Sequence, residues 1–142
     1  MGTEMHAHIE VLRNDVWYHF AAPILTNRII FAAINGKSIE CFEESFQKKI
    51  HPKASCKGFP SNASEVTKIC YKHDEKACCL NGAGVLTSDD INALQDHLWK
   101  LHEYEPRSHW RLEELFHTYI NGGKIEDHHG WDDARIVFWY DG

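Results

Sequence analysis

The two ends of the chain constrain the fold most, because each has the residue pattern of a β-strand. Over residues 4–12, apolar and polar residues alternate, with Met5, Ala7, Ile9 and Val11 on one side and Glu4, His6, His8 and Glu10 on the other. A period of two predicts a half-buried strand with its polar side turned away from the core. The turn-forming residues 13–15 and the aromatic segment 16–21 then predict a hairpin, which Pro23 ends.

Residues 134–140 predict the strand at the other end, but their pattern leaves the buried face undecided. One face would carry Arg135, Val137 and Trp139, and the other Ile136, Phe138 and Tyr140. A terminal strand seldom stands alone, because an unpaired edge is costly. We therefore expect this strand to join the N-terminal hairpin in one small antiparallel sheet.

Helix signals fill the middle of the chain. Thr26 is a candidate cap for a helix that continues to residue 34 and ends at Asn35-Gly36, and Ser64 is a candidate cap for a helix over residues 65–75. Thr87 and Asp90 form a capping box before a helix with an apolar stripe, which consists of Ile91, Leu94, Leu98 and Leu101. A further helix is expected over residues 108–120.

The remaining segments predict loops. Residues 37–63 contain Pro52, Gly58 and Pro60, so we expect irregular structure there, although residues 39–50 are also compatible with a helix. Asn81-Gly82-Ala83-Gly84 predicts a flexible connection. The predicted fold class is α+β, a small antiparallel sheet of the N-terminal hairpin and the C-terminal strand packed with about three to four helices.

Composition excludes several classes of protein. A chain of 142 residues predicts a single domain spanning residues 1–142. A net charge of -6 argues against a nucleic acid or a membrane as the main partner, because both require clustered Lys and Arg. No apolar run is long enough to span a membrane and no signal peptide is visible, so we expect a cytoplasmic protein of the host cell with reduced cysteines.

Histidine and acid at both ends suggest a metal site. His6 and His8 are two residues apart in a strand and share a face, which suits a pair of nitrogen ligands. The segment before the last strand would supply more ligands, so the candidate metal set is His6, His8, His128 and Asp132. The alternative is a solvated strand face without metal, and we expect no obligatory cofactor.

The same face is also a candidate binding platform. Aromatic rings stack on purine or nicotinamide, and Arg binds phosphate with two hydrogen bonds. The candidate ligand-binding residues are Trp17, His19, Arg135, Trp139 and Glu10. The alternative is that the Trp side chains pack under a helix or in a homodimer interface. No order of Ser, His and Asp and no phosphate-binding loop indicates a reaction.

Several segments resemble a biochemically uncharacterised family of small phage and prophage proteins. The resemblance rests on residues 131–141, on residues 5–11 followed by Trp17, on Gly58-Phe59-Pro60 with Ser64, and on Asn27-Arg28 before residues 31–36. It covers most of the chain and is weakest over residues 37–56. It implies a phage or prophage setting and no catalytic residues.

That setting favours a small accessory protein that is a binder and not an enzyme. We expect it to antagonise host defence by sequestering a nucleotide-like ligand or by binding a host protein, as a homo-oligomer. The alternatives are a metal-dependent hydrolase with a His-x-His/Asp site and a structural component of the virion or its assembly.

Overall fold

The computed structural model describes residues 4–26, 28–52, 58–77, 80–101, 103 and 132–141, which belong to two compact units. The first, here called the sheet unit, combines Met1–Thr26, Cys56–Ser88 and Ile125–Gly142. The second, the helical unit, combines Asn27–Ser55 and Asp89–Lys124. The predicted α+β class is confirmed, with an antiparallel sheet and several helices.

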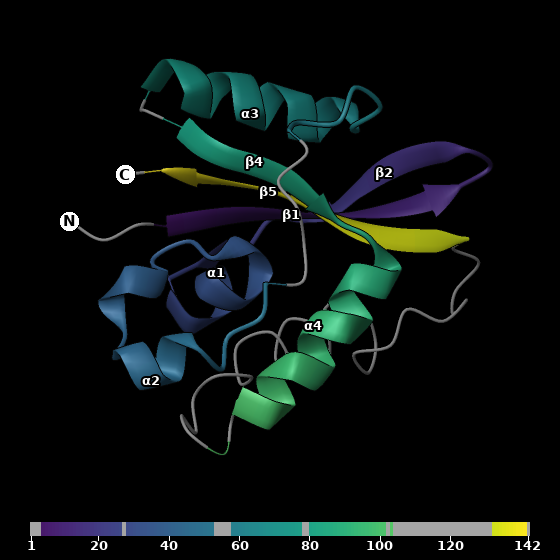
Figure 1. Cartoon of the computed structure of the whole chain (residues 1–142). Helices are drawn as coiled ribbons and strands as arrows, with labels where there is room; N and C mark the ends of the chain where they lie inside the picture. Colours follow the sequence, from purple (N-terminus) through teal and green to yellow (C-terminus); the bar gives the residue numbers. More distant parts are fainter. Residues whose placement is uncertain are drawn as a thin grey trace. The chain divides into compact units, whose positions relative to one another are not determined.

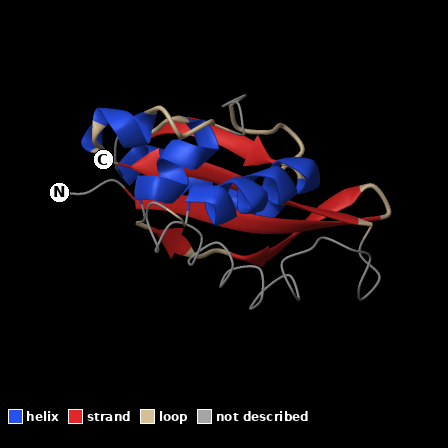
Figure 2. Ribbon diagram, turned by 60° about the horizontal axis from the view of Figure 1, so that its bottom comes forward, coloured by secondary structure: helices blue, strands red, loops and turns tan. Residues whose placement is uncertain are grey.

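The sheet unit is built on the pairing of the first and last strands. β1 (Glu4–Arg13) and β5 (Asp133–Asp141) lie antiparallel at the centre of the order β2-β1-β5-β4, with β2 (Val16–Ala21) and β4 (Leu80–Leu86) outside them. The short β3 (Ile24–Leu25), which the sequence did not predict, also pairs with β1. Figures 1 and 2 show the strands side by side.

A tight turn closes the predicted hairpin. Asn14 and Asp15 both have positive φ, 51° and 64°, which matches the type I′ turn that two-residue hairpins favour. The turn is fixed from outside by Asp132, whose carboxylate accepts a hydrogen bond from the Asn14 amide at 3.0 Å. The Asp132 amide in turn donates to the Leu12 carbonyl at 2.8 Å.

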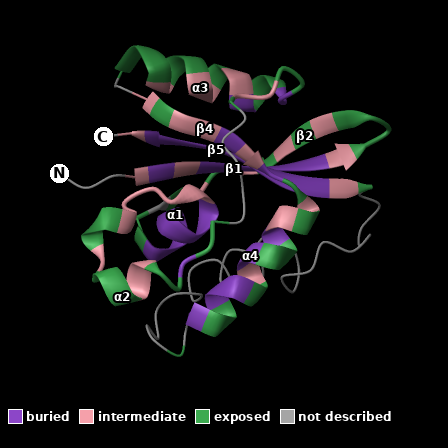
Figure 3. Cartoon of the chain, viewed as in Figure 1, coloured by how far each residue is buried: buried purple, intermediate pink, exposed green. Residues whose placement is uncertain are grey.

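The central strands are buried on both faces, which the sequence did not predict. All residues from Ala134 to Tyr140 of β5 are buried, as are those from Ala7 to Val11 of β1 (Figure 3). The expectation that the polar side of β1 faces solvent is therefore wrong for His8 and Glu10. It also follows that β5 has no solvent-exposed face, which explains why its sequence pattern was ambiguous.

The expectation of a flexible connection over residues 81–84 is also wrong, because these residues lie inside β4. Its pairing with β5 shifts register between Asn81 and Gly84, and Gly82 has φ 64°. A glycine with positive φ at a register shift is typical of a β-bulge in an edge strand. The glycines thus mark an irregularity of the strand and not its end.

α3 (Glu65–Ala77) completes the sheet unit, and it begins where the sequence predicted. The Thr67 amide donates to Ser64 Oγ at 3.2 Å, which is the expected N-cap interaction. Residues Gly58–Ser64 lead into this helix, and the Gly58 amide donates to the Ala83 carbonyl of β4 at 3.0 Å. This hydrogen bond attaches the loop that precedes α3 to β4.

The helical unit contains α1 (Arg28–Asn35), the 3-10 helix η1 (Ile39–Cys41), α2 (Glu44–Gln47) and most of α4 (Ser88–Leu101). α1 is buried from Ile29 to Ile34, and Gly36 ends it with φ 82°, as predicted. The predicted stripe of α4 is buried. Over residues 39–50 two short helices form where one longer helix was the alternative. The helix expected over residues 108–120 lies outside the described residues.

Of the helices that are described, none combines the length and the apolar character required to cross a membrane. The cysteines that the structure describes, Cys41 and Cys70, are free thiols.

The turn geometry generates the first prediction. Asp15→Gly removes a side chain from a left-handed position, so we expect the free energy of unfolding to rise by about 0.5–1 kcal/mol. Urea denaturation measures this change. Lys72→Gly, in the middle of α3, is the control. It should lower the free energy of unfolding by about 1 kcal/mol, because glycine is unfavourable inside a helix. A loss of stability in Asp15→Gly comparable to that of Lys72→Gly would contradict the turn assignment.

Candidate functional site

The register of β1 against β5 decides which residues share the histidine face. Directly opposite residues point to the same side of an antiparallel pair. Arg135 lies opposite Glu10, Val137 opposite His8, and Trp139 opposite His6. The ambiguity of the last strand is thereby resolved, because Arg135 and Trp139 join the histidines, and Ile136, Phe138 and Tyr140 lie on the other face.

β2 adds two more of the predicted residues to this face. Trp17 pairs with Leu12 and His19 pairs with Glu10, which are on the same side of β1 as His6 and His8. The structure therefore brings together Trp17, His19, Glu10, Arg135 and, further along, Trp139. Their role in ligand binding stays a prediction.

The face is not the open platform that was expected, because α3 packs on it. The exposed fraction is 4% for His8, 0% for Glu10, 7% for Arg135 and 0% for Trp139. Tyr71 of α3 makes an edge contact with the Trp139 ring at 5.1 Å, and Asp74 accepts a hydrogen bond from the Trp139 indole at 3.0 Å. For Trp139 the alternative of packing under a helix is thus confirmed.

Glu10 is the centre of a buried polar network beneath the start of α3. One carboxylate oxygen accepts hydrogen bonds from the Ser64 amide at 2.7 Å and from Thr67 Oγ1 at 2.8 Å. The other accepts from Arg135 Nε at 2.9 Å and lies 2.8 Å from Arg135 Nη2. A buried carboxylate is tolerated when it is paired and hydrogen-bonded in this way. Glu10 therefore joins β1, β5 and α3.

Arg135 extends the network toward β2. Its Nη1 donates to the Asn62 side-chain oxygen at 3.0 Å, and the carbon at the centre of its guanidinium lies 4.0 Å from the centroid of the Trp17 ring. The geometry is that of a cation–π contact. Because Glu10 and Asn62 hold the Arg135 side chain, that side chain in turn positions the Trp17 ring.

An open pocket of about 400 Å³ adjoins Trp17. Two short segments line it, residues 15–19 at the turn and in β2, and residues 62–66, which run from the loop into the start of α3. The volume is within the range of small-molecule sites. The Glu10 network attaches the second of these segments to the sheet.

His8 and His19 form a neutral pair between the network and the Trp139 ring. His8 Nδ1 lies 3.1 Å from His19 Nε2, and the His8 ring stacks on Trp139 with centroids 4.5 Å apart. Burial lowers the pKa of His8 to about 4, and the neighbouring His19 and His6 add to this effect. Burial also lowers the pKa of His19. One imidazole donates and the other accepts, so the accepting ring must be uncharged, and the lowered pKa of each ring favours the neutral form of both.

The predicted metal set His6, His8, His128 and Asp132 is not assembled by the described residues. His8 is turned toward His19 and Asp132 is hydrogen-bonded beside Leu12. Asp132 is thus about 20 Å from His6 along β1, at about 3.3 Å per residue. His128 lies outside the described residues.

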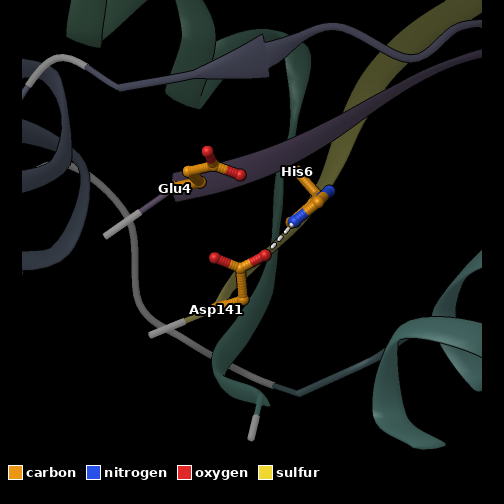
Figure 4. A group of neighbouring side chains, drawn as sticks. All are labelled: Glu4, His6 and Asp141. Carbon is orange, nitrogen blue, oxygen red and sulfur yellow. Dashed lines mark hydrogen bonds and ion pairs between the residues drawn. The ribbon is translucent and has the colours of Figure 1, made fainter. Parts of the chain in front are cut away.

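His6 has different neighbours, and they are carboxylates. Its Nε2 lies 2.5 Å from an Asp141 oxygen and its Nδ1 lies 3.6 Å from Asp74. Figure 4 shows Glu4, His6 and Asp141 converging at the start of β1 and the end of β5, and these are the side chains that could hold a metal ion. Sequence reasoning missed Asp141, although the alternation of 135, 137 and 139 continues to it. Asp74 had no such signal, because only the packing of α3 brings it close.

Comparison with known proteins gives no match: no family model fits the sequence, and no curated protein or solved structure matches the chain. Function must therefore be argued from the chemistry of the site itself.

The Glu10 network generates the second prediction. Glu10→Gln leaves the Arg135 cation buried without its counter-charge, so we expect a loss of about 3–5 kcal/mol in the free energy of unfolding. Urea denaturation measures it. Glu75→Gln, on an exposed position of α3, is the matched control and should change stability by about 0.5 kcal/mol or less. Combining Glu10→Gln with Arg135→Met should recover part of the loss. Equal effects of Glu10→Gln and Glu75→Gln would contradict the network.

The neutral histidine pair generates the third prediction, a loss of stability in acid. The pKa of His8 is about 4 in the fold against 6.5 in the unfolded chain, so the unfolded chain binds the proton more tightly. The contribution of neutral His8 is complete above pH 6.5 and is lost as the pH falls to about 4. We expect a loss of roughly 3 kcal/mol over this window.

Denaturation curves of the wild type and of His8→Gln between pH 7 and pH 4 isolate this contribution, because all other groups titrate in both. The variant should lose less stability in acid than the wild type. His73→Gln, at a side chain that is 80% exposed, is the control and should follow the wild type. Parallel pH profiles for the wild type and His8→Gln would refute the assignment.

Proposed function

We propose that this chain is a small, non-enzymatic accessory protein of a phage or prophage that binds the base of a nucleotide-like ligand in the pocket beside Trp17. The observation that carries the proposal is the Trp17 ring, which is half-buried beside an open pocket and is oriented by Arg135 at 4.0 Å. The phage setting and the antagonism of host defence rest on the resemblance of the sequence alone.

The chemistry of the lining supports a planar ligand with hydrogen-bonding groups. Trp17 and His19 contribute aromatic rings to the lining, and Asn62 contributes an amide side chain. Stacking of a base on an aromatic side chain contributes about 1–3 kcal/mol, and every base has a suitable face. The size of the pocket fits a nucleoside better than a dinucleotide.

The charges of the pocket support the base as the recognised part. Asp15 and Glu65 in the lining are both exposed, and the positive charge of Arg135 is matched by Glu10. Phosphate groups would meet net negative charge in the pocket, so they are expected to point into solvent. A nucleoside should consequently bind at least as tightly as its monophosphate.

The fourth prediction concerns the affinity of the pocket for nucleosides. Calorimetry measures it with adenosine, guanosine, cyclic nucleotides and ADP-ribose as probes. Removal of the stacking ring in Trp17→Ala should weaken binding by about 5- to 150-fold, which corresponds to the loss of 1–3 kcal/mol. Trp99→Ala, at an exposed position of α4 in the helical unit, is the matched control and should leave affinity unchanged.

Two results would contradict the proposal: no binding of any probe to the wild type, or equal affinity in Trp17→Ala and the wild type. If instead a host protein is captured and Trp17→Ala does not weaken it, the ligand pocket has no part in the function.

A further inference from the structure

The antiparallel register places two carboxylates and an imidazole together at the ends of β1 and β5. Glu4 lies directly opposite Asp141, and His6 follows Glu4 by two residues and therefore points to the same side. One ligand atom from each of the three side chains lies within 4.8 Å of the other two (Figure 4). Ligand atoms around a bound transition metal are about 3 Å apart, given bonds of about 2.0–2.2 Å. A small rotation of the exposed Glu4 side chain would close this difference.

The two nitrogens of His6 have different surroundings, as in a metal-binding histidine. Nε2 faces Asp141 at 2.5 Å, and Nδ1 faces Asp74 at 3.6 Å. The Trp139 indole donates to the same Asp74 oxygen at 3.0 Å. A carboxylate behind one ring nitrogen favours the proton there and leaves the lone pair of the other nitrogen for a metal. The ring is further oriented by its stacking on Trp139 at 6.1 Å.

The local charge also favours a cation. Glu4, Asp74 and Asp141 bring three carboxylates to one imidazole, so the group is negative even when His6 carries a proton. The side chains of His6, Asp74 and Asp141 are 16%, 21% and 22% exposed, so the charges are partly removed from water while an ion can still enter. Like charges in such surroundings repel more strongly than on an open surface.

We propose that Glu4, His6 and Asp141 form a binding site for a divalent transition-metal ion, with Asp74 as the positioning residue for His6. One nitrogen and two oxygen ligands suit Zn²⁺ or Mn²⁺ better than Ca²⁺, which prefers a larger set of oxygens. The site is about 13 Å along β1 from Glu10 and is independent of the proposed ligand pocket.

The fifth prediction is tested on the full chain without an affinity tag, by calorimetry with Zn²⁺ and Mn²⁺ and by metal analysis after dialysis. We expect one ion per chain. Glu4→Gln and Asp141→Asn should each weaken binding by at least tenfold, and Asp74→Asn by about 10- to 100-fold. His51→Gln, which removes an exposed histidine of the helical unit, is the control and should bind as the wild type does.

Circular dichroism checks that each variant is folded. Glu4→Gln is the most informative variant, because the Glu4 side chain is exposed and its replacement should not disturb the fold. An absence of binding to the wild type would overturn the proposal. So would binding that is unchanged in Glu4→Gln and Asp141→Asn, or lost in His51→Gln. Nucleoside binding by the same variants should be unaffected, so the outcome here is separate from that of the pocket.

Discussion

The pairing of the first strand with the last is the constraint on which the sheet unit depends. Nine consecutive residues of β1, from Glu4 to Leu12, pair with β5. This register places Arg135 opposite Glu10 and Asp141 opposite Glu4, and so creates both polar groups of the face. A shift by one residue would turn every side chain of one strand to the other face. The backbone pairing of β1 with β5 therefore decides which side chains can meet in the Glu10 network and in the His6 group.

The Glu10 network shows why polar residues lie under a helix in this unit. Burial of a charge is costly, but Glu10 has a donor or a cation at each of its oxygens. The same contacts fix the start of α3 and hold Arg135 against Trp17. One carboxylate thus links the packing of α3 to the geometry of the pocket. The polar face makes these specific contacts, whereas the opposite face carries mainly apolar side chains, among them Ile9, Ile136 and Phe138.

Much of the fold could be predicted because it depends on local patterns. The alternation of β1, the turn at Asn14 and Asp15, and the cap at Ser64 each have a cause within a few residues. β4 was missed because its glycines indicate a loop locally, while a bulge against β5 makes them a strand. The face of β5 was undecided because both faces are buried. The contacts of Asp74 depend on where α3 packs, which no local pattern encodes.

The position of α3 on the histidine face is tested most directly by NOE spectroscopy on a protein with labelled aromatic residues. The structure predicts strong contacts between the rings of Trp139 and Tyr71, whose centroids are 5.1 Å apart, and between Tyr71 and Phe59 at 4.2 Å. Contacts of Tyr71 with Phe138 or Tyr140 in place of Trp139 would mean that β5 presents its other face to α3. That result would contradict the register and, with it, both polar sites.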